Sequence, residues 1–447
     1  MSGFVLLLFA AGLLFCLLKG ISILLALTGG YVLFFLYAMA KGFSAGQILR
    51  MSLQGILTVK NILLTFVLIG ALTGIWRASG CVPAIVCYAS GLMRPQIFLF
   101  LTFALCAFVS VLTGTSFGTA ATMGVICMSI GNSMGLSVFY LGGAILSGVF
   151  WGDRCSPVST SALLVATVTK TDLYTNIRNM LRTALFPTLL VSALYLLVGF
   201  GLPAGEATLD VGGIFRQEFS IHPICLLPAA MILLLSLLRV GVKRSMLVSI
   251  LTAVGAALLV QHMTVAGILR TMLWGFHARN DQLQSLINGG GISSMCRVAA
   301  IVCIASCYAG IFDQTGLLNF LQKGIRQLSG KTSPMFAMTV VSVPVSAIAC
   351  NQTLSIMLTR QLTQDLPVCS ADQALYLENT VVLLSGLIPW SIAGAVPLST
   401  VGAPTACMLF AAYLYILPAW NLLTDTIIRK QKYTKQETKV YKKRKKA

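Results

Sequence analysis

Two apolar segments of this chain are interrupted by side chains that carry hydroxyl or amide oxygens. The polar residues are Thr115 and Ser116 in the interruption at 114–122, and Asn351, Gln352 and Ser355 in the one at 350–355. Polar groups inside hydrocarbon are costly, and oxygen atoms are the ligands that hard cations prefer. The pattern therefore predicts a site for a small cation, with Na+ at Thr115, Ser116 and Asn351. The alternative is close packing of helices through small residues.

Two carboxylates lie beside apolar segments and could carry a proton or bind a cation. The neighbouring candidate residues are Ser156, Ser159 and Thr160 after Asp153, and Asn379 and Thr380 after Glu378. Asp153 has a structural alternative, because the adjacent Arg154 could neutralise it at a helix end. Glu378 also has an alternative, since it could be solvated at the membrane interface. Both carboxylates are predicted to belong to the site.

The composition requires a membrane to surround the elements that hold these residues. Of 447 residues, 57% are hydrophobic and 10% are charged, whereas a soluble domain has roughly 25% charged residues. A bilayer span needs about 20 mostly apolar residues. Stretches of this kind lie near 4–18, 20–40, 56–76, 96–114, 134–151, 184–203, 223–238, 245–262, 295–312, 334–350, 376–396 and 402–424. We expect an all-α polytopic membrane protein with about 10–13 spans.

The two polar interruptions occupy equivalent places in an internal repeat. The heptapeptide at 74–80 matches the one at 310–316, an offset of 310 − 74 = 236. The same offset aligns Thr115 with Asn351 and Ser116 with Gln352. Two further matches have offsets of 238 (147–148 with 385–386) and 240 (157–160 with 397–400). Duplicated membrane units are typical of secondary transporters, whose substrate site lies between the repeats.

The repeat and the charges together suggest a division of the chain. We expect N-terminal spans at 1–50, a first repeat unit at 51–200, connecting spans at 201–290, a second unit at 291–428 and a tail at 429–447. The tail holds ten Lys or Arg and one acid. Such clusters stay on the cytoplasmic side and attract anionic lipid, so nucleic-acid binding is not predicted. By the same rule, 152–182 and 239–244 should be cytoplasmic loops, and 204–222 should face outward.

Motifs typical of soluble metal-binding or nucleotide-binding proteins do not account for this sequence. Its thirteen cysteines and three histidines lack zinc-site spacing, and no nucleotide-binding P-loop occurs. Neither a metalloenzyme, an ATP-driven pump nor a bound cofactor is predicted. Cysteines scattered within apolar runs are typical of small buried side chains.

Four segments carry a resemblance to a known family: GIWRASGCVP at 74–83, GDRCSP at 152–157, NGGG at 288–291 and LIPW at 387–390. In these the chain resembles the NhaC-type sodium/proton antiporters of the ion-transporter group. The resemblance implies two inverted repeats with broken or re-entrant helices, and exchange of protons for sodium. Its relatives also include carriers of organic acids and amino acids. The chain departs from the pattern at Thr160 and Asn379, where the family often has acids.

The sequence therefore predicts a multi-pass transporter of the cell membrane that exchanges Na+ and H+ by alternating access. In this mechanism Glu378 or Asp153 releases its proton when Na+ binds. The alternative is a sodium-coupled carrier of amino acids or organic acids on the same scaffold. The partners are then Na+, H+ or a small organic substrate, and the lipid bilayer; a homodimer is left open.

Overall fold

The described part of the chain consists of helices. The computed structural model describes residues 2–19, 22–89, 94–157, 159–201, 211–238, 240–280, 283–284, 287–315, 333–364 and 366–425. Within these residues no strand is present, and one isolated bridge joins Phe276 and Gly289. All thirteen cysteines are free thiols. The predicted all-α class is confirmed, while the basic tail at 429–447 lies outside the described residues.

An aromatic cluster fixes the N-terminal helices to a long helix from the second half of the chain. Helices α1 (Ser2–Leu18) and α2 (Ile23–Ala40) pack beside α17 (Ile292–Thr315). The ring of Phe34 lies edge-on to those of Phe9 and Phe312, with centroids 4.9 and 4.8 Å away, and also contacts Tyr308. Edge-to-face pairs of this kind stabilise packing beyond simple burial.

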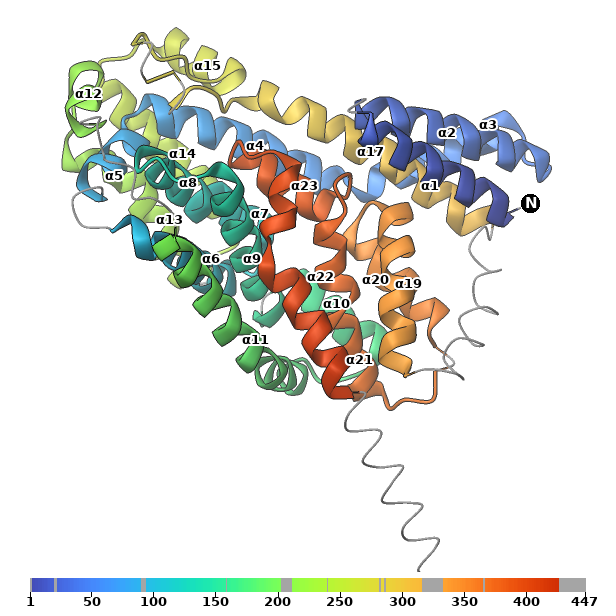
Figure 1. Cartoon of the computed structure of the whole chain (residues 1–447). Coiled ribbons are helices and arrows are strands. Elements are labelled where there is room, and N and C mark those ends of the chain that lie inside the picture. The colour runs from blue at the N-terminus through green and yellow to red at the C-terminus, as the bar shows by residue number, and fades with distance from the viewer. Residues whose placement is uncertain are drawn as a thin grey trace, which may run out of the picture.

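Two long helices pack reciprocally against two short amphipathic ones. α17 packs on α3 (Ala45–Thr58), and α4 (Lys60–Ala78) packs on α15 (Val265–Trp274). A Cβ atom at Gly310 would lie 2.1 Å from the carbonyl oxygen of Met51 on α3, and one at Gly74 would lie 2.7 Å from that of Thr271 on α15. These glycines open the two matching heptapeptides, so the repeated sequence has a shared packing role. Figure 1 shows α4 and α17 side by side.

The remaining helices of the first half form one packed group. They are α5 (Cys81–Ala89), α6 (Pro95–Thr113), α7 (Ser116–Thr119), the π-helix η1 (Ala120–Gly124), α8 (Val125–Ser133), α9 (Val138–Cys155), α10 (Thr160–Thr169) and α11 (Leu173–Gly201). Two hydrogen bonds tie α9 and its end to α6: the hydroxyls of Ser110 and Ser156 donate to the carbonyl oxygens of Val149 and Val111, at 2.7 and 2.6 Å. The end of α9 is therefore held against the end of α6.

The second half continues from the connecting helices α12 (Val211–Glu218), η2 (Pro223–Leu226), α13 (Leu227–Leu237) and α14 (Val242–Leu259). After α17 it comprises α19 (Pro334–Ala349), α20 (Gln352–Leu362), α21 (Ser370–Asn379), α22 (Val381–Leu384), η3 (Ser385–Leu387), α23 (Ile392–Thr400), η4 (Thr405–Phe410) and a helix at 412–425. Helices α19 to α23 lie below α17 in Figure 1.

The number of continuous spans is smaller than the sequence suggests. Within the described residues, four helices are long and apolar enough to cross a membrane: α4, α6, α11 and α17. A fifth span arises if the segments Ser370–Leu387 and Ile392–Thr400, bent by 55°, count as one. Other expected spans are shorter helices, because breaks divide several apolar runs. The count of 10–13 thus remains a prediction.

Two local expectations are wrong. The segment 152–182 was expected to be a loop, but it contains α10 and the start of α11. The match of 157–160 with 397–400 does not relate equivalent places, since Ser159 caps the start of α10 while Ser399 lies in the last turn of α23. Short sequence matches among small and hydroxyl residues therefore also occur between segments whose backbones have different structures.

Candidate ion-binding site

Two helices break in the same way, at positions 236 residues apart. α6 ends at Gly114 in the left-handed region (φ 64°, ψ 24°), and Thr115 is extended (φ −149°, ψ 131°) before α7 begins. α19 ends at Cys350 (φ 54°, ψ 6°), and Asn351 is extended (φ −143°, ψ 131°) before α20 begins. The expected pairing of Thr115 with Asn351 thus corresponds to one backbone geometry used twice.

The polar side chains at these breaks first serve the backbone. The Thr115 hydroxyl accepts a hydrogen bond from the Gly118 N–H at 2.8 Å, and the Asn351 amide oxygen accepts one from the Thr353 N–H at 2.9 Å. Each side chain thereby caps the helix that follows the break. A hydroxyl and an amide oxygen each have a second acceptor position, so capping leaves room for a further ligand.

Asp153, in the last turn of α9, lies between Ser116, just after the first break, and Ser159, the N-cap of α10. It is 4% exposed, and one carboxylate oxygen accepts a hydrogen bond from the Ser159 hydroxyl at 2.8 Å. The hydroxyl and the backbone N–H of Ser116 also act on this carboxylate. Two of the predicted site residues, Ser116 and Ser159, are therefore assembled around the carboxylate of a third.

The next residue, Arg154, does not neutralise Asp153. Its side chain is fully buried; one terminal nitrogen donates to the Tyr413 hydroxyl at 3.0 Å and the other to the side-chain oxygen of Asn379. Both partners are neutral, and they come from the helix at 412–425 and from α21. The expected Asp153–Arg154 pair is thus replaced by a contact between the two halves of the chain.

Glu378, the neighbour of Asn379, is a buried carboxylate without a hydrogen bond. Its exposure is 0%, and neither carboxylate oxygen has a hydrogen-bond partner within the described residues. The charged groups that act on it are Arg154 and Asp153. A solvated position at the interface, the alternative considered from sequence, is wrong. An ionised carboxylate in this setting is costly, and a bound proton or cation would remove the cost.

The backbone breaks again beside Glu378. Thr380 separates α21 from α22 with non-helical dihedrals (φ −121°, ψ −85°). Its hydroxyl donates to the Tyr376 carbonyl at 2.7 Å and accepts a bond from Ser342 at 3.3 Å. The Gln352 amide donates to the Val382 carbonyl at 2.9 Å, which connects the second break to the Glu378 region.

Other predicted site residues lie apart from the carboxylates. Thr160 is exposed at the start of α10. The hydroxyl of Ser156 donates to α6, as described above, and that of Ser355 donates to the Asn351 carbonyl at 2.7 Å. These side chains support the backbone at the breaks, and the structure does not bring Thr160 into the site.

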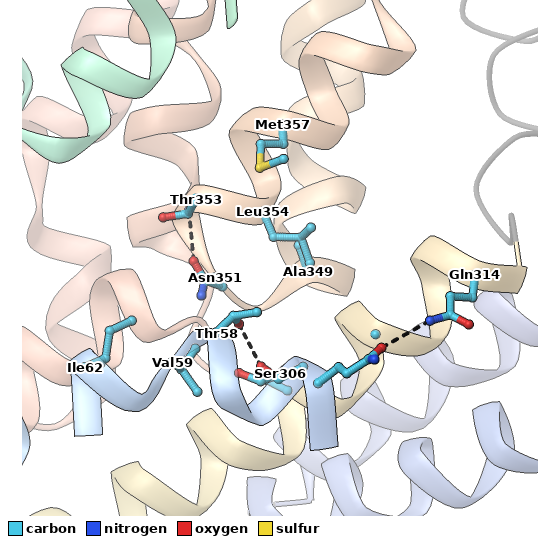
Figure 2. A pocket seen from close by; sticks show the side chains of 14 residues that line it. Thr58, Val59, Ile62, Ser306, Gln314, Ala349, Asn351, Thr353, Leu354 and Met357 are labelled. Atoms are coloured by element: carbon cyan, nitrogen blue, oxygen red, sulfur yellow. Dashed lines mark hydrogen bonds between the residues drawn. The ribbon is translucent and has the colours of Figure 1, made fainter. Parts of the chain in front are cut away.

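Asn351 lines a separate cavity of about 330 Å³. Figure 2 shows Asn351, Thr353 and Met357 on one side, Thr58 and Ile62 on another, Ser306 below them and Gln314 at the right. The cavity thus lies between α20, the junction of α3 with α4, and α17. The side chains that line it are neutral. Among the described residues, Asn351 therefore lines this cavity while Thr115 and Ser116 do not, and the cation site expected from these three residues stays a prediction.

The segment 114–118 also fits the serine-hydrolase pattern GxSxG, as does 42–46. In hydrolases this pattern forms a sharp turn from a strand into a helix that exposes the serine. Here the turn follows helix α6, and Ser116 is buried beside Asp153. The arrangement around Ser116 is that of a carboxylate-binding group.

Sequence reasoning missed Tyr413 and Ser342, and it gave Arg154 the wrong partner. Tyr413 lies within an apolar run that reads as an ordinary span, and its fully buried hydroxyl is revealed by packing alone. A phenol within such a run is the one signal that could have marked it, because buried hydroxyls need partners.

Comparison with known proteins gives a consistent picture. The profile of the Na+/H+ antiporter family matches residues 2–200 and 152–420. A malate-2H(+)/Na(+)-lactate antiporter of Bacillus subtilis is 29% identical, over 88% of this chain and 86% of its own length. The Na(+)/H(+) antiporter NhaC of Alkalihalophilus pseudofirmus is also 29% identical, over 80% and 79%. The arginine/ornithine antiporter ArcD of Halobacterium salinarum is 25% identical, over 76% and 73%.

Proposed function

Because the chain belongs to the Na+/H+ antiporter family, we propose that it exchanges Na+ for H+ across a cell membrane by alternating access. The observation that carries the proposal is the pair of buried carboxylates. Asp153 accepts a hydrogen bond from Ser159 and lies beside Ser116, whereas within the described residues Glu378 has no hydrogen bond. The neighbouring hydroxyls offset part of the cost of a charge on Asp153, and an ionised Glu378 needs a proton or a cation.

These roles give a simple coupling mechanism. Na+ binds oxygens of Asp153, with the hydroxyls of Ser116 and Ser159 turned toward the ion as ligands. Its charge, together with that of Arg154, favours release of the proton from Glu378. Loss of Na+ restores the proton on Glu378, because no described residue forms a hydrogen bond with the bare carboxylate. Binding of Na+ at Asp153 therefore disfavours binding of H+ at Glu378, and the reverse also holds. This mutual exclusion is the condition for exchange.

Flux into proteoliposomes tests this mechanism. An imposed Na+ gradient should drive proton movement that a trapped pH-sensitive dye reports. Glu378→Gln should abolish the exchange while the protein stays folded, since the amide keeps the size of the side chain but cannot titrate. Asp153→Asn should weaken the apparent affinity for Na+ at least tenfold, because removing a charged ligand costs more than about 1.4 kcal/mol.

Asp172→Asn is the matched control for these substitutions. Asp172 is exposed at the start of α11, where the backbone N–H and the hydroxyl of Thr175 hold the pKa of its carboxyl below the usual value. The group stays ionised at neutral pH, and Asn can replace it as a helix cap. Exchange should be unchanged. Wild-type pH profiles in both Glu378→Gln and Asp153→Asn would overturn the carboxylate mechanism.

A second candidate function is exchange of an organic acid or amino acid coupled to Na+ or H+. Arg154 favours it, because this buried cation has two neutral partners and could pair with a substrate carboxylate. The relatives named for malate, lactate, arginine and ornithine point the same way. Counterflow of these labelled compounds in the same proteoliposomes decides the matter. Saturable uptake that Arg154→Gln abolishes would support this function over Na+/H+ exchange alone.

A further inference from the structure

A second polar cavity lies beside α15, away from the candidate ion-binding site. Its volume is about 660 Å³. The residues that define its character are Glu218, Arg270, Trp274, Phe276, His277 and Arg279. Figure 1 shows α15 at the outer edge of the helix assembly. The cavity is thus at the periphery of the protein, where lipid can reach it.

The charges in this cavity favour an anion. Arg270 and Arg279 are both exposed. Glu218, the acid in the same lining, accepts hydrogen bonds from the backbone N–H groups of Arg279 and Asn280 at 2.7 and 3.1 Å. These bonds hold the carboxylate against the backbone. Two guanidinium groups therefore face one acid that is already bound, and guanidinium groups suit phosphate oxygens.

An apolar stripe runs along the same helix. Val265, Leu269 and Leu273 follow one another at every fourth residue, and they are 63%, 54% and 49% exposed. Trp274, which also lines the cavity, is 67% exposed. The opposite face of α15 buries Ile268 and packs on α4. A ten-residue helix is too short to cross a bilayer, and this pattern is typical of a helix that lies along its surface.

We propose that the cavity beside α15 binds a phospholipid with an anionic headgroup. The phosphate lies between Arg270 and Arg279, and the acyl chains lie along Val265, Leu269 and Leu273. Free phosphate would explain the arginines but not the adjoining exposed stripe. Trp274 lines the same cavity and is exposed, as suits a tryptophan at the headgroup level of a membrane. The proposal is independent of which ions the protein transports.

The test uses the full-length protein in nanodiscs and in detergent. Native mass spectrometry measures how many phosphatidylglycerol and phosphatidylcholine molecules stay bound, and thermal denaturation measures the shift in Tm that each lipid causes. The wild type should retain phosphatidylglycerol preferentially. Arg270→Gln and Arg279→Gln should each weaken this retention about fivefold, the usual effect of one basic residue near anionic lipid. Transport in phosphatidylcholine vesicles should not change.

Two comparisons make the result specific. Arg178→Gln with Arg182→Gln removes two exposed arginines of α11 and should leave retention unchanged. Leu269→Ser with Leu273→Ser should lower lipid retention while any Tm shift caused by inorganic phosphate persists. Equal loss in the α11 variant would reduce the effect to general surface charge and overturn the proposal. A shift in Tm with inorganic phosphate as large as that with the lipid would also overturn the proposal. The same holds if lipid retention is unchanged by all four substitutions on and beside α15.

Discussion

Arg154 on α9 donates a hydrogen bond to the side-chain oxygen of Asn379 on α21, while the adjacent Glu378 has no hydrogen-bond partner among the residues that the structure describes. An arginine and a glutamate so placed would ordinarily pair. The neutral amide instead holds the guanidinium, and Tyr413 holds its other end. The positive charge of Arg154 therefore acts on Glu378 although none of the described hydrogen bonds joins the two side chains.

Tyr413→Phe is the first test of this arrangement. It removes one hydrogen bond to a buried guanidinium, which should lower the free energy of unfolding by about 1.5–3 kcal/mol. Arg154 would then be free to pair with Glu378, so exchange should slow and its pH profile should change. Thermal denaturation and the dye assay measure the two effects. Tyr415→Phe, the same change at a side chain 42% exposed, is the control. Identical behaviour of both variants would contradict the positioning role.

Ser116 and Ser159 are expected to set the affinity for Na+. Ser116→Ala removes the hydroxyl beside Asp153, and the apparent KM for Na+ should rise about tenfold, as expected for roughly 1.4 kcal/mol. Ser159→Ala should do the same and also cost stability, because its hydroxyl caps α10. Ser159→Thr keeps the hydroxyl and should restore both properties. Ser129→Ala is the control, since that hydroxyl binds only the Val125 carbonyl. An unchanged KM in Ser116→Ala would remove this residue from the site.

The two helix breaks should respond differently to substitution. Gly114→Ala places a side chain in the left-handed region and should destabilise the protein by about 1–2 kcal/mol. Cys350→Gly relieves the same conformation at φ 54° while making the unfolded chain more flexible, so the net change should stay below about 1 kcal/mol. The shift in Tm measures both. A neutral Gly114→Ala would mean that the break is not fixed in the folded protein.

The inverted orientation of the two repeat units is a further prediction, and chemical labelling can test it. Thr115→Cys and Asn351→Cys, each introduced into a chain whose thirteen cysteines are replaced, should react with a membrane-impermeant thiol reagent from opposite sides of the membrane. Intact cells and inside-out vesicles supply the two sides. Labelling of both positions from one side would show that the units are not inverted.

The site was predictable where it depends on local sequence. Gly114 and its neighbouring hydroxyls marked one break, and the offset of 236 transferred that prediction to Asn351, where no glycine is present. The prediction for Arg154 was wrong for a physical reason. Sequence offers Asp153 as the nearest partner, whereas the actual contact spans 225 residues and depends on how α9 packs against α21.

Continuity of the spans was less predictable. The apolar run at 376–396 reads as one helix, but it is divided at Thr380 and again at 388–391. Hydropathy shows that the segment is apolar enough to be buried. Where its helix is interrupted depends on side chains elsewhere in the chain, which form hydrogen bonds with the backbone groups that the break exposes. Trp390 gives an example, because its indole N–H donates to the Ala347 carbonyl at 2.7 Å beside the Cys350 break.

The glycine contacts of α3 with α17 and of α4 with α15 limit how the protein can move. A Cβ atom at Gly55 would lie 2.0 Å from the Ser306 carbonyl oxygen, so the two backbones touch there. Sliding such a pair by one turn would drive a larger side chain into a carbonyl group. We expect these four helices to remain a single rigid frame throughout the transport cycle. The displacement that exposes the carboxylates to each side in turn must then occur in the helices that carry them.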